Sequence, residues 1–123
     1  MKMQLAKNAL QWLLALSLAL LLGGPAFAGD QSADINRGNE VYHQTCVACH
    51  GADGKGAIPG APDFTKSGGV LSHSEDLLEQ RVENGFHSRG SPMSMPAKGG
   101  NPTLTEDDIR DVLVYMQSAF QPH

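Results

Sequence analysis

Apolar residues near the end of the chain recur with the period of an α-helix. Four of them follow the spacing i, i+3, i+4 and i+7: Ile109, Val112, Leu113 and Met116. Thr105 stands before them as an N-cap residue. Three acidic residues come directly after it, in the first turn, where the helix dipole favours negative charge. The pattern predicts an amphipathic helix whose apolar face lies on a core.

Two further helices are predicted earlier in the chain. The first covers residues 35–45, with Asp34 as its N-cap. Its apolar residues are Val41 and Tyr42, with Ile35 as a further candidate.

The other helix is predicted to start near Ser72, because Ser72 and Glu75 have the spacing of a capping box. Gly85 is suited to end it. Residues 51–69 and 86–103 are rich in glycine and proline and show no strand pattern. We therefore predict an all-α domain of three or more short helices. Loops of this length in a compact domain usually build a site.

The N-terminus has the pattern of a secretory signal peptide. Two lysines precede an apolar run over residues 9–22, and Ala26-Phe27-Ala28 is a small-residue cleavage pattern. We predict a cleaved signal peptide over residues 1–28, export to the periplasm, and a flexible lead over residues 29–33. An uncleaved membrane anchor is the alternative. The apolar run is shorter than the roughly 20 residues of a spanning helix, so we expect no stable membrane insertion of the mature chain.

Cleavage would change the charge of the protein. Two of the nine basic residues are lost and all 13 acidic residues stay, so the net charge becomes 7 − 13 = −6. This charge argues against nucleic acid as a partner and favours a partner with a basic docking patch. The remaining chain also has few large aromatic residues, which suggests that something besides side chains fills its centre.

Both cysteines lie in one short C-x-x-C-H motif, formed by Cys46, Cys49 and His50. A thioredoxin-like dithiol requires a βαβ pattern, which is not visible in this sequence. A structural zinc site requires four ligands, and His50 directly follows Cys49, a poor spacing for closing a tetrahedron. The interpretation that fits is covalent attachment of one c-type haem. The two cysteines would form thioethers, and His50 would be the proximal ligand of the iron.

A sixth ligand is expected from the second long loop. Met93 and Met95 lie there without any helical period to bury them, whereas Met116 fits the pattern of a core residue. A methionine sulfur is a good ligand for haem iron. We prefer Met95, because Pro96 after it restrains the chain. Met93 stays open as a candidate, and His87 would give a bis-histidine alternative.

Taken together, these features resemble the class I c-type cytochromes, small single-haem proteins with His/Met ligation. The resemblance covers residues 34–119, with residues 120–123 as a C-terminal tail. The matching pieces are Gly38, Tyr42, residues 46–51, Gly54, Gly56, Ala61-Pro62, residues 95–100, Leu104-Thr105 and residues 114–116.

The resemblance implies the cytochrome c fold, with three to five short helices and long loops around one covalently bound haem. It implies that the first and last helices cross, that Gly38 permits their close approach and that Tyr115 packs at the crossing. It also implies that the carbonyl of Pro62 accepts a hydrogen bond from Nδ1 of His50 and so orients the ring.

The function implied is transfer of one electron between redox proteins. With His50 and Met95 both on the iron, no position stays open for a substrate, so we expect a carrier and not an enzyme. We also expect a monomer. Two alternatives remain: a haem enzyme or ligand sensor whose sixth ligand is displaced, and a fixed electron-entry subunit of a larger dehydrogenase or oxidase.

Overall fold

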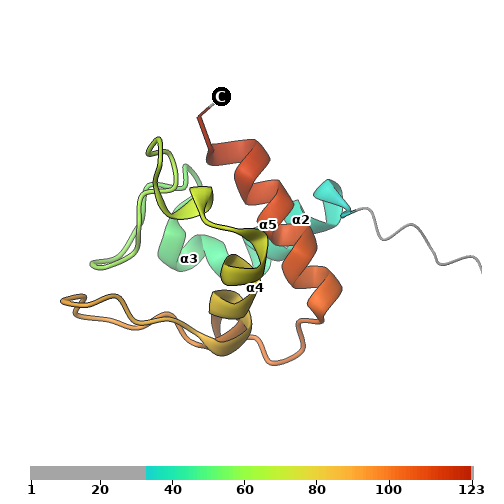
Figure 1. The fold of residues 1–123 in the computed structure, drawn as a ribbon. Helices are drawn as coiled ribbons and strands as arrows, with labels where there is room; N and C mark the ends of the chain where they lie inside the picture. The colour runs from blue at the N-terminus through green and yellow to red at the C-terminus, as the bar shows by residue number, and fades with distance from the viewer. Residues whose placement is uncertain (1–32, 123) are drawn as a thin grey trace, which may run out of the picture. The chain divides into compact units, whose positions relative to one another are not determined.

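The structure is a computed structural model that describes residues 33–122, and these residues form helices joined by long loops (Figure 1). The α-helical and π-helical elements are α2 (Ile35–Val41), a π-helical segment (Tyr42–Cys46), α3 (Val47–His50), α4 (Glu75–Asn84) and α5 (Glu106–Phe120). Two short 3-10 turns cover Val70–Ser72 and Ala97–Gly100. Within residues 33–122 the extended pairing is limited to one bridge, between Phe86 and Met95. The predicted all-α class is confirmed.

Residues 1–32 lie outside this description. They include the predicted signal peptide over residues 1–28 and all but the last residue of the predicted lead. Along residues 33–122, no helix has the length and apolar character needed to cross a membrane.

The first predicted helix is longer than expected, because the helical path runs through α2, the π-helical segment and α3 to His50. Val41 and Tyr42 are buried, as predicted. Ile35 does not join them: it is 42% exposed, so its placement on the apolar face was wrong. It lies in the first turn, before the chain reaches the core. The π-helical turn ends at Cys46, which it leaves buried.

The start of the second predicted helix needs a correction. Ser74, and not Ser72, is the N-cap of α4, and no side-chain capping bond is formed there. Ser72 instead ends the 3-10 turn Val70–Ser72. Leu71 in this turn is 3% exposed, and its burial determines how the chain enters α4. Gly85 ends the helix as predicted, with a positive φ of 78°.

The last helix follows its pattern closely. Its four periodic apolar residues are all buried: Ile109, Val112, Leu113 and Met116. Thr105 and Asp108 form a reciprocal capping box. Oγ1 of Thr105 accepts from the Asp108 amide at 3.1 Å, and Oδ2 of Asp108 accepts from the Thr105 amide at 3.0 Å. Two of the backbone donors at the start of α5 are thereby satisfied.

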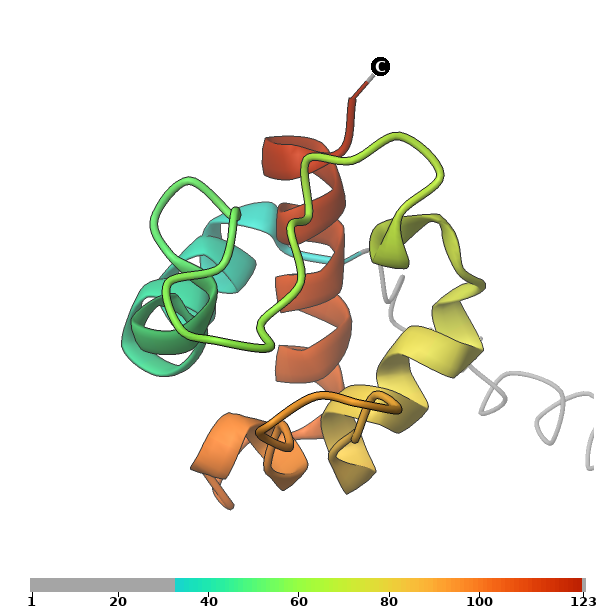
Figure 2. The same ribbon diagram turned by 90° about the vertical axis from the view of Figure 1, so that its left-hand side faces the viewer.

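α2 crosses α5, and the two views agree on this arrangement (Figures 1 and 2). Gly38 lies at the contact. A Cβ atom built on Gly38 would overlap the carbonyl oxygen of Asp111 and come within 2.9 Å of the Tyr115 Cβ. The close approach at Gly38 and the packing of Tyr115 at the crossing are both confirmed. Glycine stands here because no side chain fits, which offsets its low helix propensity.

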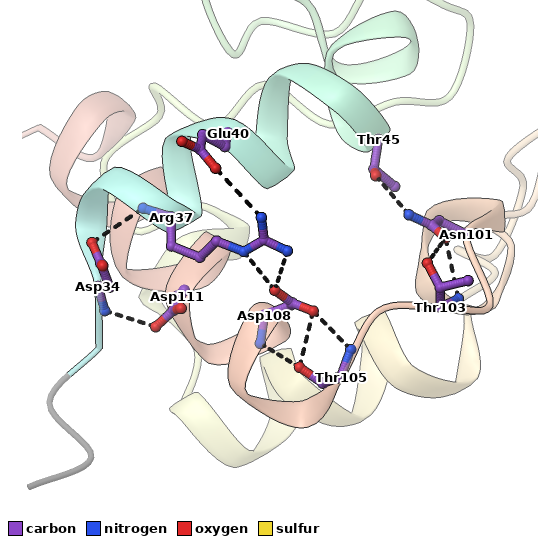
Figure 3. A network of polar contacts seen from close by, with 9 residues as sticks. All are labelled: Asp34, Arg37, Glu40, Thr45, Asn101, Thr103, Thr105, Asp108 and Asp111. Carbon is purple, nitrogen blue, oxygen red and sulfur yellow. Dashed lines mark hydrogen bonds and ion pairs between the residues drawn. The ribbon is translucent and has the colours of Figure 1, made fainter.

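Polar contacts hold the same crossing at its edge (Figure 3). The Asp108 carboxylate lies 2.7 Å from Nη2 of Arg37, and Oδ1 of Asp111 accepts from the amide of Asp34 at 2.7 Å. The amide of Thr105, followed by the Arg37 guanidinium, holds the pKa of Asp108 below its usual range. Asp108 thus joins the cap of α5 to α2.

Gly38→Ala should destabilise the protein although alanine is the better helix former. Propensity favours alanine by about 1 kcal/mol, but the overlap with Asp111 forces the helices apart. We expect the free energy of unfolding to fall by about 1–3 kcal/mol in urea titrations. The matched control is Asn39→Ala at the neighbouring exposed position, which should be neutral or slightly stabilising. Equal stability of the two variants would contradict the close approach.

Asp108→Asn should lower stability by about 1 kcal/mol at neutral pH, because it removes the charge that serves both the cap and Arg37. The folded-state pKa of Asp108 is depressed, so its contribution is present above the unfolded pKa of about 3.9 and is lost as the pH falls through the lower folded value. The stability difference between wild type and variant should therefore shrink under acid. Glu106→Gln removes a charge from the same turn and should show a smaller effect at every pH.

Candidate haem site

The described domain contains a cavity of about 850 Å³, which is within the size range of ligand pockets. Its walls come from the C-x-x-C-H helix, both long loops, α4 and α5. All five residues that the sequence singled out line this cavity: Cys46, Cys49, His50, Pro62 and Met95. The fold therefore brings Cys46 and Met95, which are more than forty positions apart in the chain, to the same cavity.

The two cysteines lie one helical turn apart on the wall of the cavity. Cys46 is buried at the end of the π-helical segment, Cys49 is exposed on α3, and neither forms a disulfide. Burial, and then the neighbouring Cys49, raise the pKa of the Cys46 thiol to about 11. Redox-active dithiols need a lowered thiol pKa, so this environment argues against the dithiol interpretation.

His50 is almost fully buried at the end of α3. Burial lowers its pKa, which keeps the ring neutral at pH 7, the form that binds a metal. The ring stacks on Phe64, with centroids 4.7 Å apart and planes 20° apart. Among residues 33–122, Nδ1 of His50 is buried without a hydrogen-bond partner, so the bond expected to the Pro62 carbonyl is not formed in this structure.

Two contacts around His50 were not predicted. The Tyr42 hydroxyl donates to the carbonyl of Gly51 at 2.7 Å, which fixes the chain directly after His50. Phe64 is buried beneath the histidine ring. The sequence signal for Phe64 was weak: it is the one large aromatic residue in a loop of glycines and prolines, which suggests an anchor but does not indicate its partner.

Met95 and Met93 both line the cavity but differ in how firmly they are held. The backbone of Met95 exchanges two hydrogen bonds with Phe86, at 2.9 and 3.0 Å. A Cβ on Gly85 would lie 2.7 Å from the Met95 carbonyl oxygen, so glycine permits this close pairing. Met93 is 51% exposed, and its described backbone bonds go to the nearby Ser91 hydroxyl.

The other histidines differ in their relation to the cavity. His87 is exposed, its Nδ1 lies 2.8 Å from the Ser94 hydroxyl, and it is not among the cavity-lining residues. His43 bonds the Asn39 carbonyl. His73 does line the cavity, from the turn before α4. The bis-histidine alternative through His87 therefore gains no support.

The donor groups fit a large apolar cofactor better than a lone metal ion. Within residues 33–122, no three side chains of His, Cys, Asp or Glu gather in a way that could hold a metal. The cavity instead brings the thiols of Cys46 and Cys49, imidazoles and methionine thioethers together with apolar walls from Leu78, Val112 and Leu113. Two thiols that could form thioethers, imidazole and thioether groups that could bind iron, and a wide space with mostly apolar walls fit a covalently bound haem.

Comparison with known proteins agrees with this arrangement. The family model described as Cytochrome c matches residues 35–120. Cytochrome c-555 of Prosthecochloris aestuarii is 36% identical over 88 residues, which cover 68% of this chain and 85% of that protein. Cytochrome c6 of Pyropia tenera is 36% identical over 90 residues, which cover 70% of this chain and 93% of that protein.

A larger protein also shows similarity. The Cbb3-type cytochrome c oxidase subunit CcoP of Rhodobacter capsulatus is 33% identical over 92 residues, which cover 72% of this chain but only 31% of that subunit.

Proposed function

Because this chain belongs to the cytochrome c family, whose members bind haem c covalently, we propose that it is an exported one-electron carrier with His50 and Met95 as axial ligands. One observation carries the proposal: Cys46, Cys49, His50 and Met95 line the same apolar cavity. The haem supplies an iron that cycles between the ferrous and ferric states.

Each of these side chains has a distinct part in holding the haem. Cys46 and Cys49 tether it covalently, and His50 is already neutral and stacked on Phe64. The better-fixed backbone of Met95 supports this residue over Met93 as the second axial ligand. With both axial positions filled by protein, no substrate reaches the iron, and the protein acts as a carrier and not as an enzyme.

The partners are proposed to be redox proteins met in transient encounters. The predicted signal peptide over residues 1–28 supports a periplasmic location, and cytochromes c-555 and c6 are the kind of small protein this chain is similar to. The net charge of −6 after cleavage favours a partner with a basic patch and disfavours nucleic acid. We propose a monomer, because docking of a redox partner requires that no second copy of the chain covers the edge of the cavity.

A second function is favoured by the similarity to CcoP, an oxidase subunit. In that case the domain would be a fixed electron-entry unit of a larger complex. Purification from membranes under mild conditions separates the two: a carrier is recovered alone, whereas a subunit is recovered with an oxidase. A haem enzyme or sensor would differ again, because its ferric spectrum would be high-spin and its ferrous form would bind carbon monoxide.

The ligand assignment is tested by comparing Met95→Ala with Met93→Ala. Wild type should show the weak near-infrared band of sulfur bound to ferric iron. Met95→Ala should lose this band and lower the reduction potential, because the thioether ligand raises it. Met93→Ala is the matched control and should keep both properties. Loss of the band in Met93→Ala alone would identify Met93 as the ligand.

The electrostatic part of the proposal is tested with two small oxidants of opposite charge. Oxidation of the reduced protein by cationic hexaamminecobalt(III) should slow by about tenfold between low and high salt, as screening removes the attraction. Oxidation by anionic ferricyanide should become faster with salt. The cavity itself is lined by Arg81 and Lys98 and by no acidic residue. If this local charge dominates over the net charge, the two salt dependences will be reversed.

A further inference from the structure

Arg81 on α4 faces the cavity in an unusual environment. Its guanidinium carbon lies 4.2 Å from the centroid of the Phe86 ring. Its Nε is buried and has no hydrogen-bond partner among residues 33–122. A guanidinium that has lost water on one side gains more from an aromatic face than one in solvent, where a cation–π contact is weak. The stacking on Phe86 therefore stabilises the side chain of Arg81 more here than it would in solvent.

Phe86 connects this contact to Met95. The two residues form an isolated antiparallel bridge. The Phe86 N–H donates to the Met95 carbonyl at 3.0 Å, and the Met95 N–H donates to the Phe86 carbonyl at 2.9 Å. Within residues 33–122 no further strand extends the bridge, so its position depends on what holds Phe86. Phe86 is 40% exposed, and the stacking of its ring on Arg81 is a restraint on this half-exposed side chain.

The chain after Met95 is fixed to the same helix by a different pair. Nζ of Lys98 lies 3.2 Å from Oε1 of Glu83 on α4 and donates to the Leu104 carbonyl at 2.9 Å. Lys98 also adopts a left-handed φ of 53°, which only a well-held residue sustains. α4 thus contacts the chain on both sides of Met95. Arg81 stacks on Phe86, which is bridged to Met95, and Glu83 pairs with Lys98 after it.

We propose that Arg81 is a positioning residue that acts through Phe86 to keep the Met95 sulfur on the haem iron. The inference rests on the proposed His50/Met95 ligation. Loss of the guanidinium would free the Phe86 ring, loosen the Phe86–Met95 bridge and raise the fraction of molecules in which the sixth position is open. The role concerns how firmly the ligand is held, which global stability alone does not report.

The test uses haem-loaded ferric protein and imidazole as a competing ligand for the sixth position. Arg81→Gln should bind imidazole about five- to thirtyfold more tightly, because opening of the Met95 segment precedes binding. Arg81→Lys keeps a cation near the ring and should recover part of the effect. Arg89→Gln removes the same charge from an exposed residue of the methionine loop and should bind imidazole as wild type does.

A double-mutant cycle shows whether Arg81 acts through Phe86. Phe86→Leu removes the aromatic face but keeps an apolar side chain and the backbone N–H and carbonyl groups that form the bridge. If the two residues act as one contact, the double variant should bind imidazole no more tightly than the stronger single variant. If the effects of the two single variants on imidazole affinity multiply in the double variant, Arg81 acts by another route and the inference is wrong.

The inference and the proposed function fail in different ways. Absence of the sulfur-to-iron band in wild type would remove the His/Met ligation and this inference with it. If the band is present and Arg81→Gln binds imidazole within twofold of Arg89→Gln, the ligation stands and the role of Arg81 is refuted. Melting temperatures measured alongside show whether any change in imidazole affinity merely follows a general loss of stability.

Discussion

The haem cavity is the constraint on which the rest of this domain depends. Among residues 33–122, eleven apolar residues are buried, and eight of these line the cavity: Cys46, Phe64, Leu71, Leu78, Leu104, Val112, Leu113 and Met116. The buried residues pack on one another as one hydrophobic cluster, and most of that cluster also forms the wall of the haem cavity. A domain of this size buries little apolar surface by itself, so the flat apolar cofactor completes its core.

The crossing of α2 and α5 is the second constraint, and Tyr42 joins it to the first. Gly38 lets the helix backbones touch, and the Tyr42 ring packs against Tyr115 with centroids 5.6 Å apart. The hydroxyl of the same tyrosine bonds the Gly51 carbonyl, next to His50. The helix crossing therefore fixes where the C-x-x-C-H helix ends. Rigid support of this kind keeps a metal site in one geometry in both redox states.

The two halves of the site are built by different physical means. Cys46, Cys49 and His50 share one helical turn, so their relative positions follow from local backbone geometry. Met95 lies in an irregular loop, and its position depends on contacts to α4 and on the bridge to Phe86. Under the proposed ligation, a sulfur held in this way would be easier to release than a histidine at a helix end, and residues that do not bind the iron could adjust how firmly it is held.

The sequence by itself determined what depends on neighbours along the chain: the C-x-x-C-H motif, the periodic face and cap of α5, and the end of α4 at Gly85. Only the tertiary structure decided the stacking of His50 on Phe64, the exposure of Ile35 and the cap at Ser74. The contact between Arg81 and Phe86 belongs to this second group, as does the difference in restraint between Met95 and Met93. Short-range patterns report propensities and caps, which act over one or two turns. Burial and side-chain pairing depend instead on residues far apart in the chain, and these meet only when the walls of the cavity come together.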